Sequence, residues 1–174
     1  KFGAKLEARN AYGNTPLMLA CAGLKYDAAK ALLDAGADPK AQSTEKGETA
    51  MHCAIAGVMA RSRARTAASE NDDAGEVGKP LNEEVEADMR IIKLLLREGA
   101  DLNQQDVSGA TPLHVIVCIR ENDTVLRLAE LLLKNGANPK VPDANNKRPS
   151  DILALRPRGG ELLKTLQQHE FLIF

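Results

Sequence analysis

The chain repeats two short motifs, and internal repetition constrains the fold of a chain more than any other sequence feature. The first motif ends in Gly-Ala followed by Asp or Asn. It occurs at residues 32–38, 95–101 and 132–138, with a trace at residues 2–6. Its glycines are Gly3, Gly36, Gly99 and Gly136, so the successive steps are 33, 63 and 37 residues. A unit of about 33 residues therefore recurs, and two of its copies contain insertions.

The second motif follows each Gly-Ala by about ten residues and contains Thr-Pro-Leu or a variant of it. It occupies residues 13–17, 47–52 and 109–114, with a degenerate copy at 146–151. Thr15 and Thr111 precede Pro16 and Pro112, which suits a helix N-cap followed by the first helical residue. The Gly of the first motif suits a left-handed cap at a helix end. Each unit is therefore expected to form two short helices, which bury their apolar faces only by stacking on neighbouring units.

The two motifs together resemble the ankyrin repeat, whose signature is Thr-Pro-Leu-His-x-Ala in a period of about 33 residues. The resemblance extends from Gly3 to about Leu155. It implies an all-α solenoid of stacked antiparallel helix pairs, with β-hairpin-like fingers at about 36–48, 99–110 and 136–147. We expect about three full repeats with partial terminal units. The boundaries are 1–9 for the tail of an upstream repeat, 10–42, 43–105 and 106–142 for repeats, and 143–174 for a C-terminal capping repeat and tail.

The repeat at 43–105 carries the largest insertion. Gly47 and Gly99 are 52 residues apart where Gly13 and Gly36 are 23 apart, which places about 29 extra residues near 58–81. This stretch begins basic, turns acidic and has few large apolar residues, so it cannot offset the entropy cost of ordering. We expect the first helix to continue to about Arg65 and a mobile loop to follow. The stretch is either a tolerated surface insertion or an element that binds a partner or is phosphorylated, with Ser69 and Thr66 as candidate sites.

The two ends differ from the repeats between them. The chain opens at the tail of a repeat, so the natural protein is expected to continue upstream. Arg148 and Asp151 replace the Thr and His of the motif, which is typical of a capping repeat. The tail Phe171–Phe174 is entirely apolar. It either packs on the last repeat, docks elsewhere or precedes further structure.

Composition excludes several function classes. The chain has 23 Lys and Arg against 24 Asp and Glu, a balance that gives no basic field for nucleic acid. Aromatic residues make up 3%, too few for base-stacking platforms. No apolar run reaches the length of a membrane span. Three cysteines, an odd number and far apart, argue for a reducing compartment. We therefore expect an intracellular protein, cytoplasmic, nuclear or both, that is monomeric, does not bind nucleic acid and has no membrane span.

No catalytic or metal-binding motif is present among the patterns G-x-S-x-G, H-E-x-x-H and C-x-x-C. We expect no enzyme activity, no cofactor and no metal. The resemblance implies that His52 and His114 hydrogen-bond the backbone between neighbouring fingers. Cys21, Cys53 and Cys118 are expected to be small buried residues.

The resemblance implies a protein-interaction module of a larger protein, a scaffold or adaptor that binds a protein or peptide on its concave face. The alternative is the substrate- or partner-recognition part of a multidomain enzyme, such as a kinase, a transferase or a ubiquitin-related enzyme. Tyr12 is the best candidate for a binding hot spot, although it could instead pack within its finger. The positions that match the family's binding face are Tyr12, Asn14, Glu45, Lys46, Glu48, Val107, Ser108, Ala110, Arg120, Asn145 and Asn146.

Asn103 is a candidate modification site. Leu95, Asp101 and Leu102 precede it in the arrangement in which ankyrin repeats similar to this one are sometimes hydroxylated on Asn. The corresponding positions in the neighbouring units are Lys40 and Lys140, so only one such site is expected. Asn103 could instead simply stabilise its turn.

Overall fold

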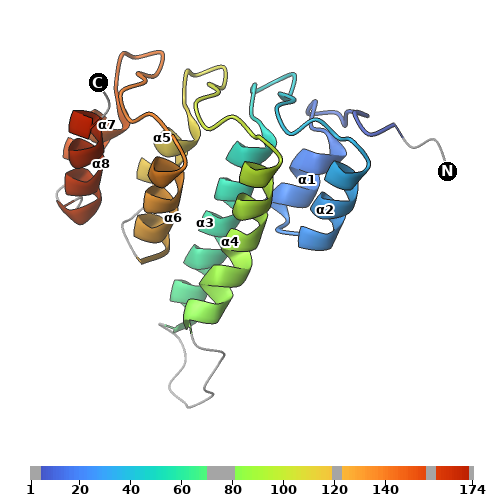
Figure 1. Cartoon of the computed structure of the whole chain (residues 1–174), viewed down its shortest axis with the longest axis horizontal. Helices are drawn as coiled ribbons and strands as arrows, with labels where there is room; N and C mark the ends of the chain where they lie inside the picture. The colour runs from blue at the N-terminus through green and yellow to red at the C-terminus, as the bar shows by residue number, and fades with distance from the viewer. Residues whose placement is uncertain (1–4, 70–80, 119–122, 156–159, 173–174) are drawn as a thin grey trace.

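The computed structural model describes residues 5–69, 81–118, 123–155 and 160–172 of the chain. Within these ranges the secondary structure is helical, apart from one isolated antiparallel bridge between Gln42 and Thr49. The helices are α1 (Pro16–Ala22), α2 (Tyr26–Asp34), α3 (Ala50–Ser69), α4 (Leu81–Arg97), α5 (Pro112–Val117), α6 (Asp123–Lys134), α7 (Pro149–Ala154) and α8 (Gly160–Leu172). Figure 1 shows them as a row of antiparallel pairs beneath a row of loops, which confirms the predicted solenoid.

The predicted helix boundaries follow from the two motifs. Proline is the first residue of α1, α5 and α7, where its missing N–H costs nothing. At the other end, Gly36, Gly99 and Gly136 follow the second helices with φ of +97°, +78° and +95°. These values lie in the left-handed region that glycine adopts without strain. The cap and stop signals of the sequence therefore set the length of the ordinary helices.

The core is a thin layer built almost entirely of aliphatic residues, as expected from the low aromatic content. Each first helix contributes side chains such as Leu17, Ile55 and Leu113, and each second helix contributes residues such as Ile92 and Leu132. All five are at most 1% exposed. Because small and aliphatic side chains let neighbouring helices approach closely, each pair buries its apolar face against the next.

The second helix pair differs from the prediction. We expected an inserted loop near 58–81 after a helix reaching about Arg65, but α3 continues to Ser69. Val58 and Met59 are buried, so this part of the insertion packs against the solenoid. Residues 70–80 lie outside the described residues, and the expectation of a mobile loop there stays a prediction. Figure 1 shows α3 and α4 projecting well beyond the neighbouring pairs.

An ion pair between Arg61 and Asp88 joins the lengthened part of α3 to α4. The Arg61 guanidinium lies 2.6 Å from Asp88 Oδ1, and the Asp88 side chain is fully buried while that of Arg61 is 46% exposed. A buried carboxylate is costly without a partner. The Arg61 guanidinium therefore offsets the cost of burying the Asp88 carboxylate between α3 and α4.

The closing unit is held by a charged network. The Arg148 guanidinium donates to both carboxylate oxygens of Asp151, and Glu170 of α8 accepts from Arg148 and from the Ser150 hydroxyl. The bonds from Arg148 lower the pKa of Asp151 to about 2. The residues that replace Thr and His therefore tie α7 to α8, as expected of a capping repeat. The backbone of Phe171 and Leu172 completes α8. Whether the tail Phe171–Phe174 packs on the last repeat, docks elsewhere or precedes further structure stays a prediction.

Candidate partner-binding face

The loops above the helices, called fingers here, share one hydrogen-bonding pattern. The side-chain oxygens of Asn10, Asp106 and Asp143 each accept two backbone N–H groups, from the residues two and four positions later. In the second finger Ser43 replaces this residue. Its backbone N–H donates to the Glu48 carbonyl, five residues on rather than four. The second finger is therefore one residue longer than the others.

A ladder of side-chain amides and a guanidinium joins each finger to the next. Gln42 Nε2 donates to the carbonyl of Gly47 in its own finger (2.8 Å) and to that of Gln105 in the next (2.9 Å). Gln105 repeats this arrangement with Gly109 and Pro142, both at 2.8 Å. In the first finger, the Arg9 guanidinium takes the place of the amide and donates to the carbonyls of Gly13 and Gln42. Because Pro142 has no side-chain donor, the ladder ends there.

The two motif histidines bridge fingers as the resemblance implied. The Nδ1 atom of His52 accepts from the Thr49 backbone N–H at 3.2 Å, so the ring proton is on Nε2. This Nε2 donates to the Ala110 carbonyl of the next finger, 3.1 Å away. His114 makes the same contacts with Thr111 and with the Lys147 carbonyl. Burial lowers the pKa of His52 below its ordinary value, which keeps the ring neutral for this role.

The fingers, joined by these hydrogen bonds, present most of the predicted binding positions to solvent. Tyr12 and Val107, at two fingertips, are 67% and 70% exposed, and Leu19 on α1 is 50% exposed. Asn14, Glu48 and Ala110 are half-buried, and Arg120 lies outside the described residues. The remaining predicted positions are exposed: Glu45, Lys46, Ser108, Asn145 and Asn146.

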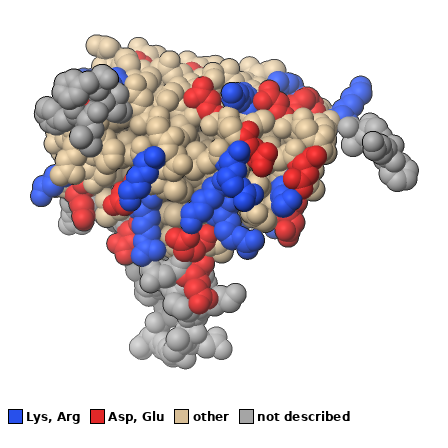
Figure 2. Space-filling view, viewed as in Figure 1, with Lys and Arg blue, Asp and Glu red and all other residues tan. Residues whose placement is uncertain are grey.

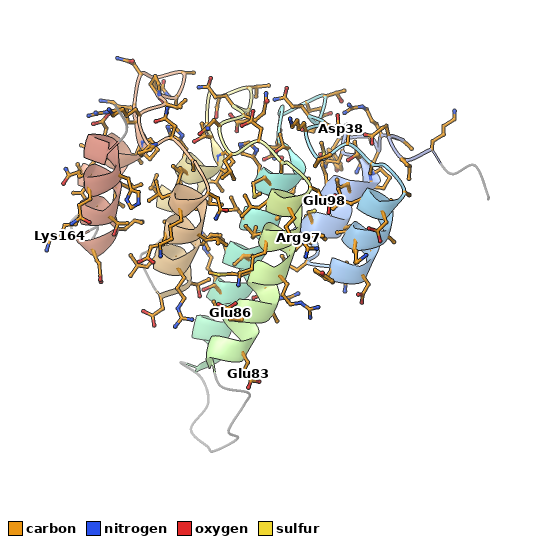
Figure 3. The ribbon with its side chains drawn as sticks, in the orientation of Figure 1. Asp38, Glu83, Glu86, Arg97, Glu98 and Lys164 are labelled. Atoms are coloured by element: carbon orange, nitrogen blue, oxygen red, sulfur yellow. The ribbon has the colours of Figure 1, made fainter. Side chains whose placement is uncertain are left out.

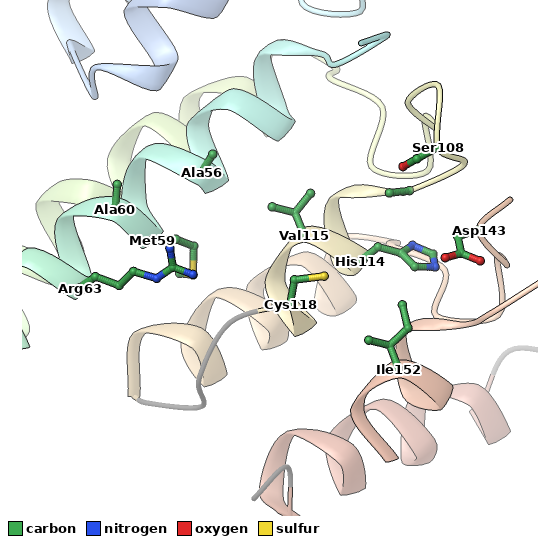
Figure 4. Close-up of a pocket in the computed structure, with 11 residues that line it drawn as sticks. Ala56, Met59, Ala60, Arg63, Ser108, His114, Val115, Cys118, Asp143 and Ile152 are labelled. Carbon is green, nitrogen blue, oxygen red and sulfur yellow. The ribbon is translucent and has the colours of Figure 1, made fainter. Parts of the chain in front are cut away.

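A groove of about 430 Å³ opens between the lengthened α3 and the next two units (Figure 4). Apolar side chains of three first helices form most of its surface, and two fingers contribute polar groups at one edge. The lining residues are Ala56, Met59, Ala60, Arg63, Ser108, Ala110, His114, Val115, Cys118, Asp143 and Ile152. The fingers and first helices thus form a face that combines exposed apolar tips with a defined groove.

Comparison with known protein families tests the predicted resemblance. The family model described as "Ankyrin repeats (3 copies)" matches residues 2–61, and the family model described as "Ankyrin repeat" matches residues 108–144. The chain belongs to the ankyrin repeat family. Ankyrin repeats are generally protein-interaction modules.

The relatives are multidomain proteins. The chain is 32% identical over 149 residues to the human neurogenic locus notch homolog protein 2, covering 81% of the chain and 6% of that protein. It is 29% identical over 148 residues to the transient receptor potential channel pyrexia of Drosophila melanogaster, covering 85% and 12%. Over 56 residues it is 43% identical to the ADP-ribosylation factor GTPase-activating protein AGD4 of Arabidopsis thaliana, covering 32% and 7%. The chain therefore spans only a small part of the length of these relatives.

The opposite face of the ankyrin solenoid is charged without a dominant sign. Figure 2 shows Lys and Arg interspersed with Asp and Glu over the second helices, and Figure 3 places Glu86, Arg97 and Glu98 along this side. Ion pairs join Lys30 to Asp34, Lys93 to Glu86 and Lys134 to Glu130. Exposed pairs of this kind contribute little stability and keep the surface soluble. In the described part of the chain, no helix combines the length and apolarity needed to cross a membrane.

The candidate modification sites lie in different settings. Asn103 is exposed, and its side chain bridges two repeats: Nδ2 donates to the Gly136 carbonyl and Oδ1 accepts from the Asn138 N–H. This supports the stabilising role, and its hydroxylation stays a prediction. Thr66 and Ser69 lie on the last turns of α3 rather than in a loop. Their phosphorylation also stays a prediction.

The expectation for the cysteines was correct for two of three. Cys21 and Cys53 are buried, and burial raises the pKa of both thiols to about 12. Cys118 is exposed instead and lines the groove. It follows the last residue of α5. The prediction that Cys118 is a buried residue was therefore wrong.

Sequence reasoning missed the groove and the Arg9–Gln42–Gln105 ladder. The ladder had a detectable signal in the sequence. Arg9, Gln42 and Gln105 each lie immediately before the first residue of a finger, which is Asn10, Ser43 or Asp106. The groove had none, because Met59, Ala60 and Arg63 were assigned to the end of a helix of uncertain length. Their position depends on α3 keeping its direction beyond the ordinary end of a first helix.

Proposed function

We propose that this chain binds a protein or peptide on the face formed by its fingers and first helices, as an interaction module of a larger intracellular protein. The single observation that carries the proposal is the exposure of Tyr12 and Val107 on two fingers that are each hydrogen-bonded to the finger between them. Large exposed apolar side chains on a rigid support are typical of binding hot spots. The support is already ordered, so binding loses little conformational entropy.

Binding rather than catalysis is the proposed activity. Histidine is the side chain most suited to acid–base chemistry near neutral pH, and two of the three histidines, His52 and His114, are occupied by bonds to the next finger. The free thiols of Cys21, Cys53 and Cys118 favour a reducing compartment, cytoplasmic or nuclear. The proposed partner is a protein or peptide rather than nucleic acid, and the chain is proposed to be monomeric.

A second candidate is a recognition domain within a multidomain enzyme. The similarity to the GTPase-activating protein of Arabidopsis thaliana, although limited to 56 residues, favours this candidate. In both cases the binding face is the same, and the difference lies in what the complete protein does with the bound partner. A full-length sequence with a catalytic domain beside these repeats distinguishes the two.

The experiment that tests the proposal compares partner capture by the native chain and by Tyr12→Ala and Val107→Ser variants. A protein captured from extract is identified by mass spectrometry, purified and titrated against each variant. We expect Tyr12→Ala to weaken binding by about 1–2 kcal/mol, or roughly tenfold, as for an exposed aromatic anchor. Because Tyr12 is 67% exposed, the free energy of unfolding should change by no more than about 0.5 kcal/mol.

Control variants on the second helices are Lys93→Ala and Lys134→Ala, which alter exposed charges on the opposite face. They should leave the affinity unchanged. If these controls weaken binding while the finger variants do not, the partner uses the second-helix face and the proposal is wrong. If Tyr12→Ala instead lowers the melting temperature with unchanged affinity, Tyr12 is a packing residue of its finger.

A further inference from the structure

The groove has one wall that an ordinary unit of this solenoid does not supply. The helices α1, α5 and α7 have seven, six and six residues, whereas α3 has 20. The seventh residue of α3 is Ala56, so Met59, Ala60 and Arg63 lie on its lengthened part. All three line the groove opposite Val115 and Ile152 (Figure 4). The helical part of the insertion therefore adds binding surface to the concave face.

The size and lining of the groove restrict what can enter it. Its volume of about 430 Å³ is at the low end of the roughly 300–1,000 Å³ range of ligand pockets. Ala56 and Ala60, both exposed, are small and leave space above the buried Met59. A few aliphatic side chains of an extended segment fit this space better than a whole helix, which is about 10 Å across.

One charge at the edge of the groove is fixed in place. Asp143 Oδ1 accepts from the backbone N–H groups of Asn145 and Lys147, at 2.8 and 2.9 Å. These bonds lower the pKa of Asp143, so its carboxylate is ionised at neutral pH. The charged residue on the opposite wall, Arg63, has a long side chain and makes an interaction of its own within the chain. The fixed carboxylate of Asp143 therefore supplies a negative charge at the finger edge of the groove.

We propose that the groove binds an extended peptide segment in which an aliphatic residue enters between α3 and α5 and an adjacent Lys or Arg pairs with Asp143. The apolar lining accounts for the first preference and the fixed carboxylate accounts for the second. This inference rests on the proposed function, since it names the partner chemistry for the same face. It also assigns the insertion a role in binding.

The experiment uses a phage-displayed library of random peptides, selected in parallel on the native chain and on Asp143→Asn. The matched control is Asp106→Asn, since Asp106 makes the same two backbone bonds in the preceding finger but does not line the groove. We expect the native chain and the control to enrich peptides with Lys or Arg beside an aliphatic residue. On Asp143→Asn the basic preference should be lost, and the best peptide should bind about twofold to fivefold more weakly.

A second pair of variants tests the wall. Ala60→Gln places a longer neutral side chain in the groove, and Ala64→Gln makes the same change one helical turn further along α3, outside the groove. Both residues are exposed, so both variants should fold, as checked by circular dichroism. Ala60→Gln should reduce peptide affinity and Ala64→Gln should not.

Several outcomes overturn the inference. Enrichment of acidic peptides would assign recognition to Arg63 instead. Peptides whose binding depends on Tyr12 or Val107 but not on Asp143 or Ala60 would leave the proposed function intact and remove this inference. If no peptide is enriched on any form of the chain, both the inference and peptide binding by this face fail.

Discussion

A single position in each unit determines whether its first helix can hydrogen-bond to the next finger. The third helical residue of the first helix is Met18, His52, His114 and Asp151 in successive units. Only the two histidines can accept from their own cap and at the same time donate to the following finger. The Met18 thioether accepts from the Thr15 N–H but has nothing to donate. Whether a first helix bonds to the next finger therefore depends on this one residue.

The neutral state of His52 makes stability dependent on pH. Burial lowers its pKa in the folded chain, whereas the unfolded chain titrates near the ordinary value of about 6.5. Below that value the unfolded chain binds a proton that the folded chain does not, so stability falls as pH decreases, by at most about 1.4 kcal/mol per pH unit. In His52→Gln the side chain no longer titrates, and unfolding curves between about pH 7 and pH 5 should show a flatter dependence. Parallel pH profiles for the two proteins would contradict this role of His52.

At the scale of elements, the contact between α1 and α3 depends on Gly57. A Cβ at this position would lie 2.5 Å from the Ala22 carbonyl oxygen, a backbone atom that cannot rotate away. Glycine to alanine inside a helix is ordinarily stabilising by up to about 1 kcal/mol. In Gly57→Ala the two helices must separate instead, and we expect a loss of about 1–3 kcal/mol in the free energy of unfolding, measured by urea denaturation.

The control for this prediction is Gly160→Ala at the start of α8, where an added Cβ meets nothing within 4 Å. This variant should be neutral or slightly more stable, because alanine reduces the conformational freedom of the unfolded chain. Equal stability of Gly57→Ala and the native chain would mean that α3 shifts without cost, contrary to tight packing at this joint.

The ordinary elements could be predicted from the sequence, because proline, threonine and glycine act locally. Pro16 and Pro112 mark helix starts, and Gly36 and Gly136 mark ends, whatever the rest of the chain does. The end of α3 could not be predicted in this way. Beyond Gly57 its sequence is rich in Ala and Arg, which favour helix but show no apolar stripe. Its packing is supplied by Val85, Met89 and the buried Asp88 of α4, which are distant in sequence.

At the scale of the whole molecule, the exposed fingertips could be predicted because the repeat fixes their register, and Tyr12 lies where it was expected. The groove could not, since it depends on three units and on the length of α3. The joints are also unequal along the solenoid. The joints after α3 and α5 each have a histidine bond between fingers. Among the described residues, the joint after α1 is instead crossed by bonds from Arg9 to the Gln42 carbonyl and from the Asp38 N–H to Glu7. Because each unit contacts only its neighbours, such differences set where opening begins.

Hydrogen exchange tests this inequality. Amides of α1 and α2 should exchange at a lower opening free energy than those of α5 and α6. In Met18→His, the imidazole should reach the Glu48 carbonyl as His52 reaches that of Ala110, since Glu48 and Ala110 each precede the Thr of the next unit. One such bond contributes about 0.5–1.5 kcal/mol, so exchange in α1 and α2 should slow by roughly twofold to tenfold. The reciprocal variant His52→Met should accelerate exchange across the next joint. Unchanged exchange in both variants would mean that packing between helices, and not the bond between fingers, controls how the solenoid opens.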